Sequence, residues 1–446
     1  MFAPDGNICK DAALLLNLHG HGYLPFVYTG PKDELLACRK TAWLGTFLNI
    51  SPVYDVSGPD LVKLLNKVTV NRDYAKLKVG KSRHAIFCDD KGRMLADGVL
   101  MRLSETHYRS YWLAPVLAYY VEVAAKEWGM GVTGKWVTDD FFLQIDGPKS
   151  LEIMEHACHE DLHDLKFAQN KAVEIAGVPC TIHRLGMSGA LAYEMHGPSD
   201  KVEDVFGAIV EAGEPYGLRK LGFSNYCHNH TQGGYPNQWI HFWYPTASNG
   251  EGMKKYCTEH DVGYPKATRY PFFGSAADDP ENAFVTPYDV GWDYLINWDH
   301  DFIGKEALAA IDKNPPRKPV TLEWNLEDVG RAYADLLANP AWHPVDDITS
   351  TGDGGESPFV MSKVMKAGEM VGVATGRSKD FYHNKMISLC WLKRDLAVDG
   401  TEVEVVWGTN PAAQVTIRAT VAPFPYYSGE YRNENFDVEK IPHYEG

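Results

Sequence analysis

The chain has 446 residues, 45% hydrophobic and 23% charged, which is typical of a folded globular protein with two or three domains and excludes a disordered or fibrous chain. Its 43 basic and 59 acidic residues give a net charge of −16, which argues against nucleic acids and anionic membrane surfaces as partners. The chain has no apolar run long enough to span a membrane and no recognisable signal peptide. Eight cysteines without a CxxC spacing favour reduced thiols, so we expect a cytoplasmic protein.

The first half of the chain alternates predicted helices and strands. Pro31 in a first turn and Gly45 at the end delimit one helix, and an apolar stripe at helical spacing marks another at 199–213. In chain order, the patterns predict helices at 31–45, in the first part of 58–70, and at 110–128, 149–157 and 199–213. They predict strands near 84–88, 94–103, 138–146, 172–184 and 191–197.

The second half divides into a long aromatic-rich stretch and a run of short strands. Residues 223–300 show no clear periodicity, which predicts loops that carry function. The Pro-rich segment 313–319 predicts a domain boundary. Beyond it, strands are predicted at 319–324, 360–366, 370–375, 386–393, 402–408 and 413–421, which together favour a small β-barrel or sandwich. We therefore expect a catalytic region at 1–315, made of two interleaved α+β subdomains, and a C-terminal β-barrel domain at 316–446.

Three short motif matches do not carry a function in this context. His159 to His163 fits the HExxH pattern of zinc proteases, but the segment is polar and ends a predicted helix. Gly129 to Gly134 fits GxGxxG, but a helix precedes it and a strand follows, the reverse of a dinucleotide site. The pair His228 and His230 has only a short HxH spacing, which is a weak signal for a metal site, so we predict a loop histidine pair near a ligand instead.

Four segments, in order over essentially the whole chain, resemble the folate-dependent aminomethyltransferase family, whose best-known member is the glycine cleavage T-protein. They are Leu24 to Gly30 followed by a helix with Arg39, Gly92 to Leu100, Gly186 to Met195, and Thr286 to Trp292 followed by Asp301 to Leu308. The resemblance implies an α+β fold of three domains in a cloverleaf, with tetrahydrofolate as the cofactor in a central channel.

The resemblance also implies which residues hold the folate. Glu194 matches the carboxylate that accepts hydrogen bonds from the pterin edge, a role that suits a bidentate acceptor. Trp292 and Tyr28 match aromatic residues near the folate, and Asp97 and Met187 lie in matching segments.

The departures from the T-protein pattern point to another branch of the family. The first of two paired acids is Ala96 here, an Arg-Asp pair is Ser224-Asn225, and the segment Asn49 to Pro52 lacks a family histidine. These changes argue against aminomethyl transfer from a lipoyl carrier as the activity of this chain. The pattern is more similar to the branch that demethylates aryl methyl ethers of the lignin type, which shares a tyrosine at Tyr226 and the run His300 to Gly304, although that branch also carries a histidine near Ile50 to Pro52.

The predicted activity is transfer of a methyl group from a methoxylated aromatic to N5 of tetrahydrofolate, giving a phenol and 5-methyltetrahydrofolate. The leaving oxygen needs an acid, and we expect Tyr226 to serve, because the ordinary pKa of tyrosine, ~10, matches that of a phenol. Positioning of the two reactants contributes more. The planar donor is expected to lie against a substrate-binding set of aromatic and histidine side chains: His228, His230, Trp239, His241 and Trp243.

Several alternatives stay open at this point. A sulfonium compound could be the methyl donor, held by aromatic faces. A methylenedioxy ring could be opened by the same folate. A non-catalytic folate-binding protein is a different class, although the KGCYxGQ-type motif of such relatives is absent here. The sequence gives no oligomeric state.

Overall fold

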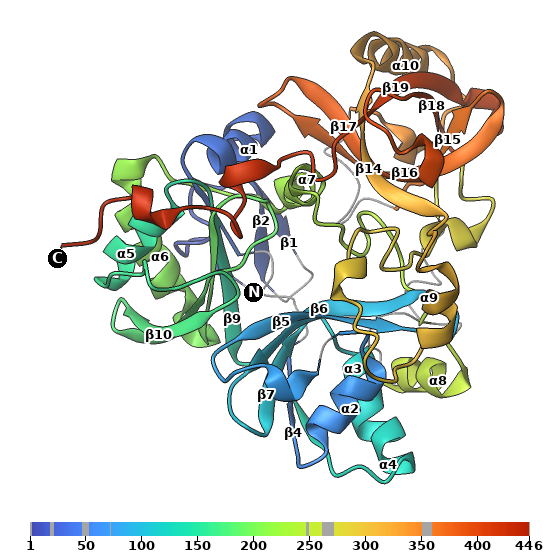
Figure 1. Ribbon diagram of the computed structural model, residues 1–446. Helices are drawn as coiled ribbons and strands as arrows, with labels where there is room; N and C mark the ends of the chain where they lie inside the picture. Colours follow the sequence, from blue (N-terminus) through green and yellow to red (C-terminus); the bar gives the residue numbers. More distant parts are fainter. Residues whose placement is uncertain are drawn as a thin grey trace.

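A computed structural model describes residues 2–17, 22–46, 53–71, 73–246, 249–260, 272–349 and 359–445. Three lobes surround a central region, and each contains its own β-structure (Figure 1). The expected α+β architecture with a closed C-terminal barrel is confirmed.

The first lobe is built on a six-stranded sheet in the order β10-β11-β12-β9-β3-β13. Helices α5 and α6 pack on one face of the sheet and bury a core that includes Leu143, Tyr193 and Phe206. The strands are β3 (Trp43–Gly45), β9 (Asp140–Asp146), β10 (Asn170–Ile175), β11 (Val178–His183), β12 (Ala192–Pro198) and β13 (Arg219–Lys220). The helices are α1 (Pro31–Lys40), α5 (Ser150–Cys158) and α6 (Val202–Gly213), and a hairpin of β1 (Leu14–Asn17) and β2 (Tyr23–Val27) lies beside them.

The second lobe is a five-stranded sheet in the order β5-β6-β7-β4-β8, and its sequence lies between β3 and β9 of the first lobe. Its strands are β4 (Val53–Ser57), β5 (Ser82–Cys88), β6 (Met94–Arg102), β7 (His107–Tyr111) and β8 (Thr133–Val137). The apolar side of α2 (Leu61–Val68), with Leu61, Leu64 and Leu65 fully buried, packs into its core. Helix α8 (Glu251–Glu259) contributes Met253 to the same core.

The third lobe is a closed barrel in the order β14-β17-β16-β15-β18-β19. Its strands are β14 (Arg317–Trp324), β15 (Ser362–Lys366), β16 (Glu369–Asp380), β17 (Lys385–Lys393), β18 (Glu402–Trp407) and β19 (Val415–Ala422). Helix α9 (Lys305–Ile311) precedes the barrel, and α10 (Leu326–Ala338) follows β14. The Pro-rich segment 313–319 ends inside a strand, because β14 begins at Arg317 and includes Pro319. We propose that the domain boundary lies just before this strand, between residues 315 and 316.

The expectation of loops throughout 223–300 is wrong at two places. Residues Phe223–Gly233 form helix α7, and Glu251–Glu259 form α8. Helix α7 has no apolar stripe because it is buried on all sides, and its polar side chains bond to neighbouring elements. It lies at the centre of the molecule, between the first lobe and the barrel (Figure 1).

Two other predicted helices differ in extent. The first ends at Lys40, and Trp43–Gly45 instead form the inner strand β3. The helix expected over 110–128 begins after β7 as α3 (Val116–Tyr119), continues as a π-helical turn (Tyr120–Ala124) and ends as α4 (Ala125–Glu127). Gly129 follows with φ 65°, a left-handed conformation that ends the helix. The GxGxxG match at 129–134 thus begins at a helix end, as its position between a helix and a strand predicts.

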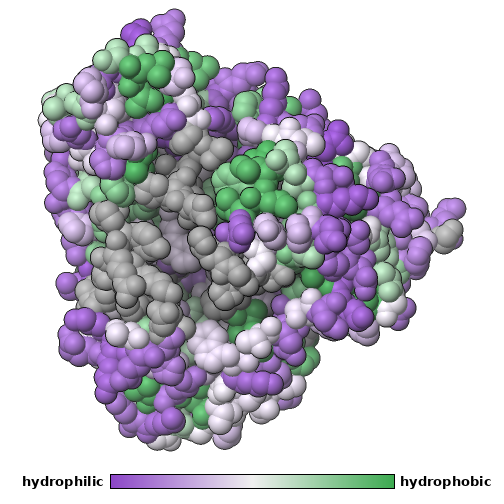
Figure 2. All heavy atoms as spheres, turned by 180° about the vertical axis from the view of Figure 1, so that it is seen from behind, coloured by the Kyte–Doolittle hydropathy of each residue, from purple (hydrophilic) through white to green (hydrophobic). Residues whose placement is uncertain are grey.

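Seen from the opposite side, the surface is mostly hydrophilic, and apolar side chains gather in patches between polar ones (Figure 2). Within the described residues, no helix has both the length and the apolar character needed to cross a membrane. All eight cysteines lie in the described part of the chain and are buried, and none of them takes part in a disulfide bond.

Candidate active site

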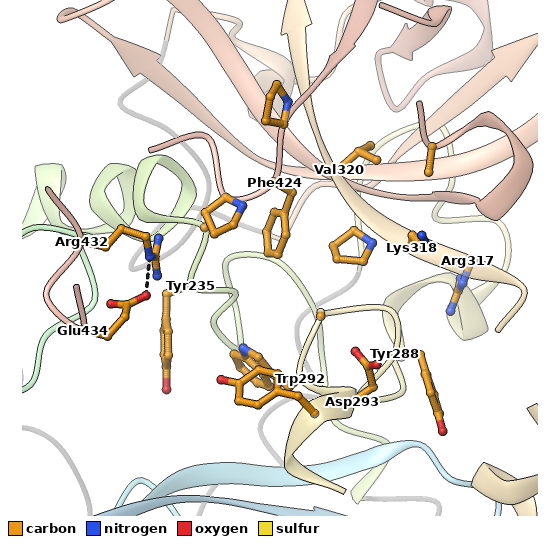
Figure 3. Close-up of a pocket in the computed structure, with 18 of the residues that line it drawn as sticks. Tyr235, Tyr288, Trp292, Asp293, Arg317, Lys318, Val320, Phe424, Arg432 and Glu434 are labelled. Carbon is orange, nitrogen blue, oxygen red and sulfur yellow. Dashed lines mark hydrogen bonds and ion pairs between the residues drawn. The ribbon is translucent and has the colours of Figure 1, made fainter. Parts of the chain in front are cut away.

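A cavity of about 1170 Å³, which we call the outer cavity, lies between the first lobe and the barrel (Figure 3). Its floor carries Tyr235 and Trp292, with ring centroids 5.3 Å apart, and its roof carries Phe424 and residues of β14. The C-terminal segment closes one side with Arg432, which bonds to Glu434. Several distant parts of the chain therefore line this cavity, and planar side chains lie along one wall.

A second, smaller space of about 100 Å³, the inner cavity, adjoins the outer one. Leu185, Gly186, Met187 and Tyr235 line both, so one ligand can lie across the junction. An engineered cavity of ~150 Å³ holds a benzene ring, so the inner cavity has the scale of about one ring. Its lining comes from β6, the end of β7, β9, β12, α7 and the 235–244 segment: Asp97, Gly98, Val99, Tyr111, Trp112, Phe142, Gln144, Glu194, Tyr226, His230, Pro236, Asn237, Gln238 and Tyr244.

Three polar side chains form a row across the first sheet. The ladder pairs Glu194 on β12 with Gln144 on β9 and with His183 on β11. Because side chains alternate along a strand, Tyr193 and Met195 enter the core while Glu194 faces the inner cavity. His183 Nδ1 lies 3.7 Å from the Glu194 carboxylate. The row thus brings acceptor groups to one wall of the cavity.

In the side-chain amide of Gln144, the nitrogen has hydrogen-bond partners and the oxygen has none among the described residues. Its Nε2 donates to Asp146 Oδ1 at 2.9 Å and contacts Met187 Sδ at 3.2 Å. Its Oε1 is buried and has no partner among the described residues. A buried acceptor without a partner costs ~1–3 kcal/mol, so this oxygen is poised for a ligand N–H. Burial raises the pKa of the neighbouring Asp146 to about 7.

A hydrogen-bonded chain links the two cavities. The Tyr244 hydroxyl donates to Asp97 Oδ1 and accepts from the Asp97 backbone N–H at 2.8 Å. The other carboxylate oxygen of Asp97 lies 2.8 Å from His84 Nε2. The ring of His84 meets Trp292 edge-on, with centroids 4.5 Å apart. Asp97 is therefore held from two sides, and the ring contact of His84 extends this series of contacts to Trp292 in the outer cavity.

Tyr226 reaches the inner cavity from α7. This helix is fixed to the barrel strand β16, where His228 Nδ1 lies 3.0 Å from Ser378 Oγ and Thr231 donates to the Gly376 carbonyl at 2.7 Å. The Tyr226 ring meets His230 edge-on at 4.7 Å. Burial, with smaller contributions from Cys227, Glu194 and Asp146, raises the pKa of Tyr226 well above its usual range. The Tyr226 hydroxyl therefore stays protonated at neutral pH, and its raised pKa does not match that of a phenol, contrary to what the sequence had led us to expect.

Comparison with known proteins places this site in a family. Residues 22–236 match the model of the GCVT N-terminal domain. The chain is 39% identical over 431 residues, 94% of each chain, to the sesamin methylene transferase of Sinomonas sp. (strain No.22). The chain belongs to the GCVT family. It is a tetrahydrofolate-dependent one-carbon transferase.

Other relatives agree with this membership. The syringate O-demethylase of Sphingobium sp. (strain NBRC 103272 / SYK-6) is 28% identical over 439 residues, 90% of this chain and 91% of that one. The fold matches the crystal structure of the glycine cleavage aminomethyltransferase T of Bartonella henselae with a TM-score of 0.65 over 95% of this chain and 96% of that one, at 17% identity. The GCVT fold is thus retained at low sequence identity.

The residues of this GCVT-family protein fit a bound tetrahydrofolate. A reduced pterin presents several N–H donors at its edge, and the inner cavity offers the Glu194 carboxylate and the unpartnered Gln144 oxygen on adjacent strands. Tyr235, which lines both cavities, and Trp292 in the outer one provide planar surfaces for the ligand. Glu194, Gln144, Met187 and Trp292 are thus the residues that would hold the folate.

The structure brings together six of the residues singled out from the sequence. Glu194, Asp97, Tyr226 and His230 line the inner cavity, Trp292 lines the outer one, and Met187 lines both. His230 is a fixed neutral ring, because Nδ1 bonds to the Tyr235 carbonyl at 2.9 Å and burial lowers its pKa to about 4.

Five other expected site residues do not line either cavity. Tyr28 donates from its hydroxyl to the Ile8 carbonyl at 2.5 Å. His228 faces the barrel, and Trp243 packs in a core with Phe359. Trp239 is 42% exposed at the surface.

The fifth of these, His241, is a structural residue. Its Nδ1 accepts from the Asn237 backbone N–H and its Nε2 bonds to Thr231 Oγ1, both at 3.0 Å. A side chain at Gly376, where φ is 60°, would stand only 2.2 Å from the His241 ring, so glycine allows this close approach. His241 therefore anchors the 235–244 segment to α7 and β16, and we no longer assign it to the substrate.

Several cavity residues were missed by sequence reasoning. Gln144 interrupts the apolar run of its strand between Leu143 and Ile145, and that polar position was a usable signal. The hydrogen bond of Tyr244 to Asp97 had no local signal, since the two residues lie 147 positions apart in the chain, and that of His84 depends on how β5 pairs with β6. The segment Asn49 to Pro52, which lacks the family histidine, lies outside the described residues.

Proposed function

We propose that this protein transfers a one-carbon unit from an aryl ether to N5 of tetrahydrofolate. The observation that carries the proposal is the arrangement of the inner cavity, where two acceptors suited to a pterin edge, Glu194 and Gln144, share one space with the protonated hydroxyl-bearing side chain of Tyr226. The first pair suits the folate, and the tyrosine suits a departing oxygen.

Two aryl ether classes are candidate donors. The relative at 39% identity is named a methylene transferase, which favours a methylenedioxy group as the donor. The relative at 28% identity is named an O-demethylase, which favours a methoxylated aromatic as the second candidate. We rank the methylenedioxy donor first on this difference, ahead of the methyl ether that the sequence pattern alone favoured.

The proposed reaction breaks one carbon–oxygen bond at a time. When bound, tetrahydrofolate supplies N5 as the atom that accepts the carbon. Opening a methylenedioxy ring moves the CH₂ unit to the folate nitrogens, and their two protons end on the two oxygens of a catechol. A methyl ether gives a phenol, with the N5 proton replacing the methyl group on oxygen.

The side chains around the cavity assist by position and hydrogen bonding. Tyr226 donates its O–H to the leaving oxygen, and donors of this type contribute ~10²–10³-fold to rate. In this proposal the donor's ring lies beside the 235–238 segment and Trp112, which line the inner cavity. Holding the reactants in line contributes up to ~7–11 kcal/mol of the barrier. Catalysis here rests mainly on positioning, with Tyr226 as the residue that touches the reacting oxygen.

The products distinguish the candidates. The purified protein is incubated under nitrogen with tetrahydrofolate and, separately, a methylenedioxybenzene, a methoxylated benzoate and a sulfonium compound, and folates are identified by mass spectrometry. A methylenedioxy donor yields 5,10-methylenetetrahydrofolate, and a methyl ether yields 5-methyltetrahydrofolate. Folate products from the sulfonium alone, or from none of the donors, would refute an aryl ether substrate.

A further inference from the structure

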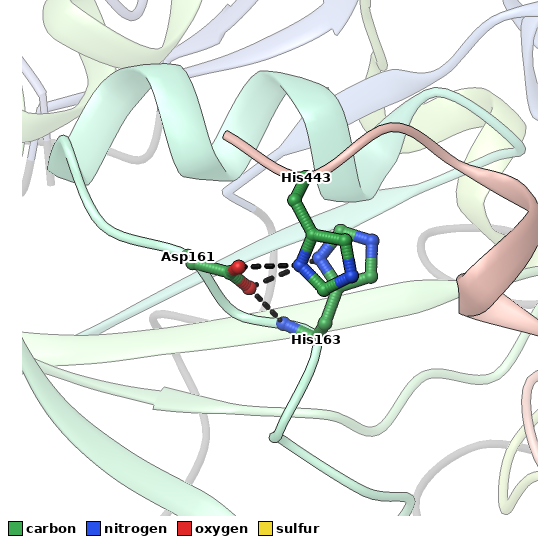
Figure 4. Close-up of side chains that lie close together, drawn as sticks. All are labelled: Asp161, His163 and His443. Atoms are coloured by element: carbon green, nitrogen blue, oxygen red, sulfur yellow. Dashed lines mark hydrogen bonds and ion pairs between the residues drawn. The ribbon is translucent and has the colours of Figure 1, made fainter. Parts of the chain in front are cut away.

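The loop after α5 and the C-terminal tail meet through two stacked histidines. The rings of His163 and His443 lie 3.8 Å apart between centroids, at an angle of 22° (Figure 4). Helix α5 ends at Cys158, and His159 has φ 55°, so the HExxH residues are not helical and do not form a zinc-protease site. Asp161 and His163 of that sequence instead turn toward the tail.

Both rings direct the same nitrogen at one carboxylate. His163 Nδ1 lies 3.0 Å from Asp161 Oδ1, and His443 Nδ1 lies 2.5 Å from Asp161 Oδ2. Glu155 Oε1, which accepts from the Leu162 backbone N–H at 2.8 Å, is also 2.9 Å from His163 Nδ1. Imidazole nitrogen and carboxylate oxygen thus converge from three parts of the chain.

The opposite nitrogen of each ring faces an outer acceptor. His163 Nε2 lies 3.1 Å from the Ile441 carbonyl, and His443 Nε2 lies 3.7 Å from Glu439 Oε2. For His163, an Nε2–H bonded to the Ile441 carbonyl leaves the lone pair on Nδ1. His163 thus has the arrangement of a metal-binding histidine, in which an outer acceptor fixes the tautomer of the ligand ring, and Glu439 lies near enough to His443 to take the same part.

A hydrogen on each Nδ1 would satisfy these contacts one ring at a time, whereas a single divalent ion among the donor atoms would be shared by both rings and the carboxylate. The donor atoms of Asp161, His163 and His443 all lie within 4.8 Å of one another.

We propose that Asp161, His163 and His443 form a binding site for a divalent transition-metal ion of the Zn²⁺ type. Two imidazoles and a carboxylate are a ligand set that Zn²⁺ accepts, and the carboxylate of Glu155 lies 2.9 Å from His163 Nδ1. His443 and Asp161 are 54% and 43% exposed, so an ion can enter from solvent and His443 can adjust to it.

The ion would have a structural role. It would fasten the end of the tail to the loop after α5, and the same tail carries Arg432 and Glu434 in the wall of the outer cavity. The site is separate from the one-carbon chemistry, so its existence does not depend on the proposed donor.

The test uses the full chain without a polyhistidine tag, stripped of metal with EDTA and titrated with ZnCl₂ by calorimetry. We expect one Zn²⁺ per chain and a rise in the melting temperature. Loss of an outer partner typically weakens metal binding ~10–100-fold, so Glu439→Gln should raise the Kd for Zn²⁺ by a factor in this range. His443→Ala removes a ligand and should raise the Kd at least ~100-fold. Both positions are exposed, so the variants should fold.

The matched control is His159→Ala, a neighbouring histidine that bonds to the Tyr444 hydroxyl and is not one of the three donors. It should bind Zn²⁺ like the wild type. Zinc binding of equal strength in His443→Ala and the wild type, or no stoichiometric binding in the wild type, would overturn the proposal.

Discussion

Glu194 and Gln144 stand opposite each other on the antiparallel strands β12 and β9, and the carboxylate of one and the amide oxygen of the other share the wall of the inner cavity. The Gln144 amide is oriented by Asp146, which takes its N–H and leaves its oxygen without a partner within the described part of the chain. The pair is a preformed set of acceptors that a pterin edge would satisfy.

Replacing either acceptor should weaken folate binding. A hydrogen bond to a charged group is worth ~1.5–3 kcal/mol, so Glu194→Gln should raise the Kd for tetrahydrofolate ~10–100-fold. Gln144→Leu should raise it less, because a neutral acceptor is lost. Fluorescence titration with tetrahydrofolate measures both. Glu203→Gln, at a part-buried carboxylate that bonds to the Ile8 backbone outside the cavities, is the control. Unchanged affinity in Glu194→Gln would mean that the pterin is held elsewhere.

Removing the Tyr226 hydroxyl should slow the chemical step. Tyr226→Phe should lower single-turnover rates with the active aryl ether by ~10²-fold, since a donor to the leaving oxygen is lost. Its Kd for tetrahydrofolate should change little. Tyr28→Phe, which removes a buried hydroxyl outside both cavities, should retain the wild-type rate. Equal rates in Tyr226→Phe and the wild type would remove Tyr226 from the mechanism.

Asp146 should make the protein less stable as the pH rises. Burial raises its folded-state pKa to about 7, above the ordinary value of ~3.9, so between these values the folded state binds more protons than the unfolded state. The free energy of unfolding therefore falls from pH 4 toward pH 7, by about 1.4 kcal/mol for each unit of pKa difference. Asp146→Asn should flatten this part of the profile in urea unfolding at pH 5 to 8. An identical pH profile in the variant and the wild type would contradict this assignment.

His241 should matter for stability rather than for substrate binding. His241→Ala removes two buried hydrogen bonds and leaves a void, which should cost ~2–4 kcal/mol of unfolding free energy. The KM for the aryl ether should stay near the wild-type value in the protein that remains folded. A raised KM with an unchanged melting temperature would return His241 to the substrate site.

Much of the fold follows from local sequence patterns. The alternating strands of the barrel and the apolar stripe of α6 were predicted within a few residues, because one face of each packs against a core. Helix α7 was not, because its burial on every side removes the periodicity, and residues such as His228 and Thr231 find partners only on β16.

The site was predictable where a residue lies in a motif and faces the cavity. Glu194, Trp292 and Tyr226 meet both conditions. Tyr28 and His241 lie in suggestive segments, but the orientation of their side chains is set by distant contacts with Ile8 and Thr231. Sequence patterns identify chemical types, and only the tertiary packing decides which of them face the ligand.

The insertion of the second sheet between β3 and β9 has a consequence for biosynthesis. Strand β3 is hydrogen-bonded to β9 on one side and to β13 on the other, so the first sheet needs residues 219–220 before its last ladder can close. During translation, β3 must wait while the whole intervening sheet emerges from the ribosome, and such long loop closures are slow. Chaperone dependence or stalled, protease-sensitive nascent chains would be the cellular trace of this chain topology.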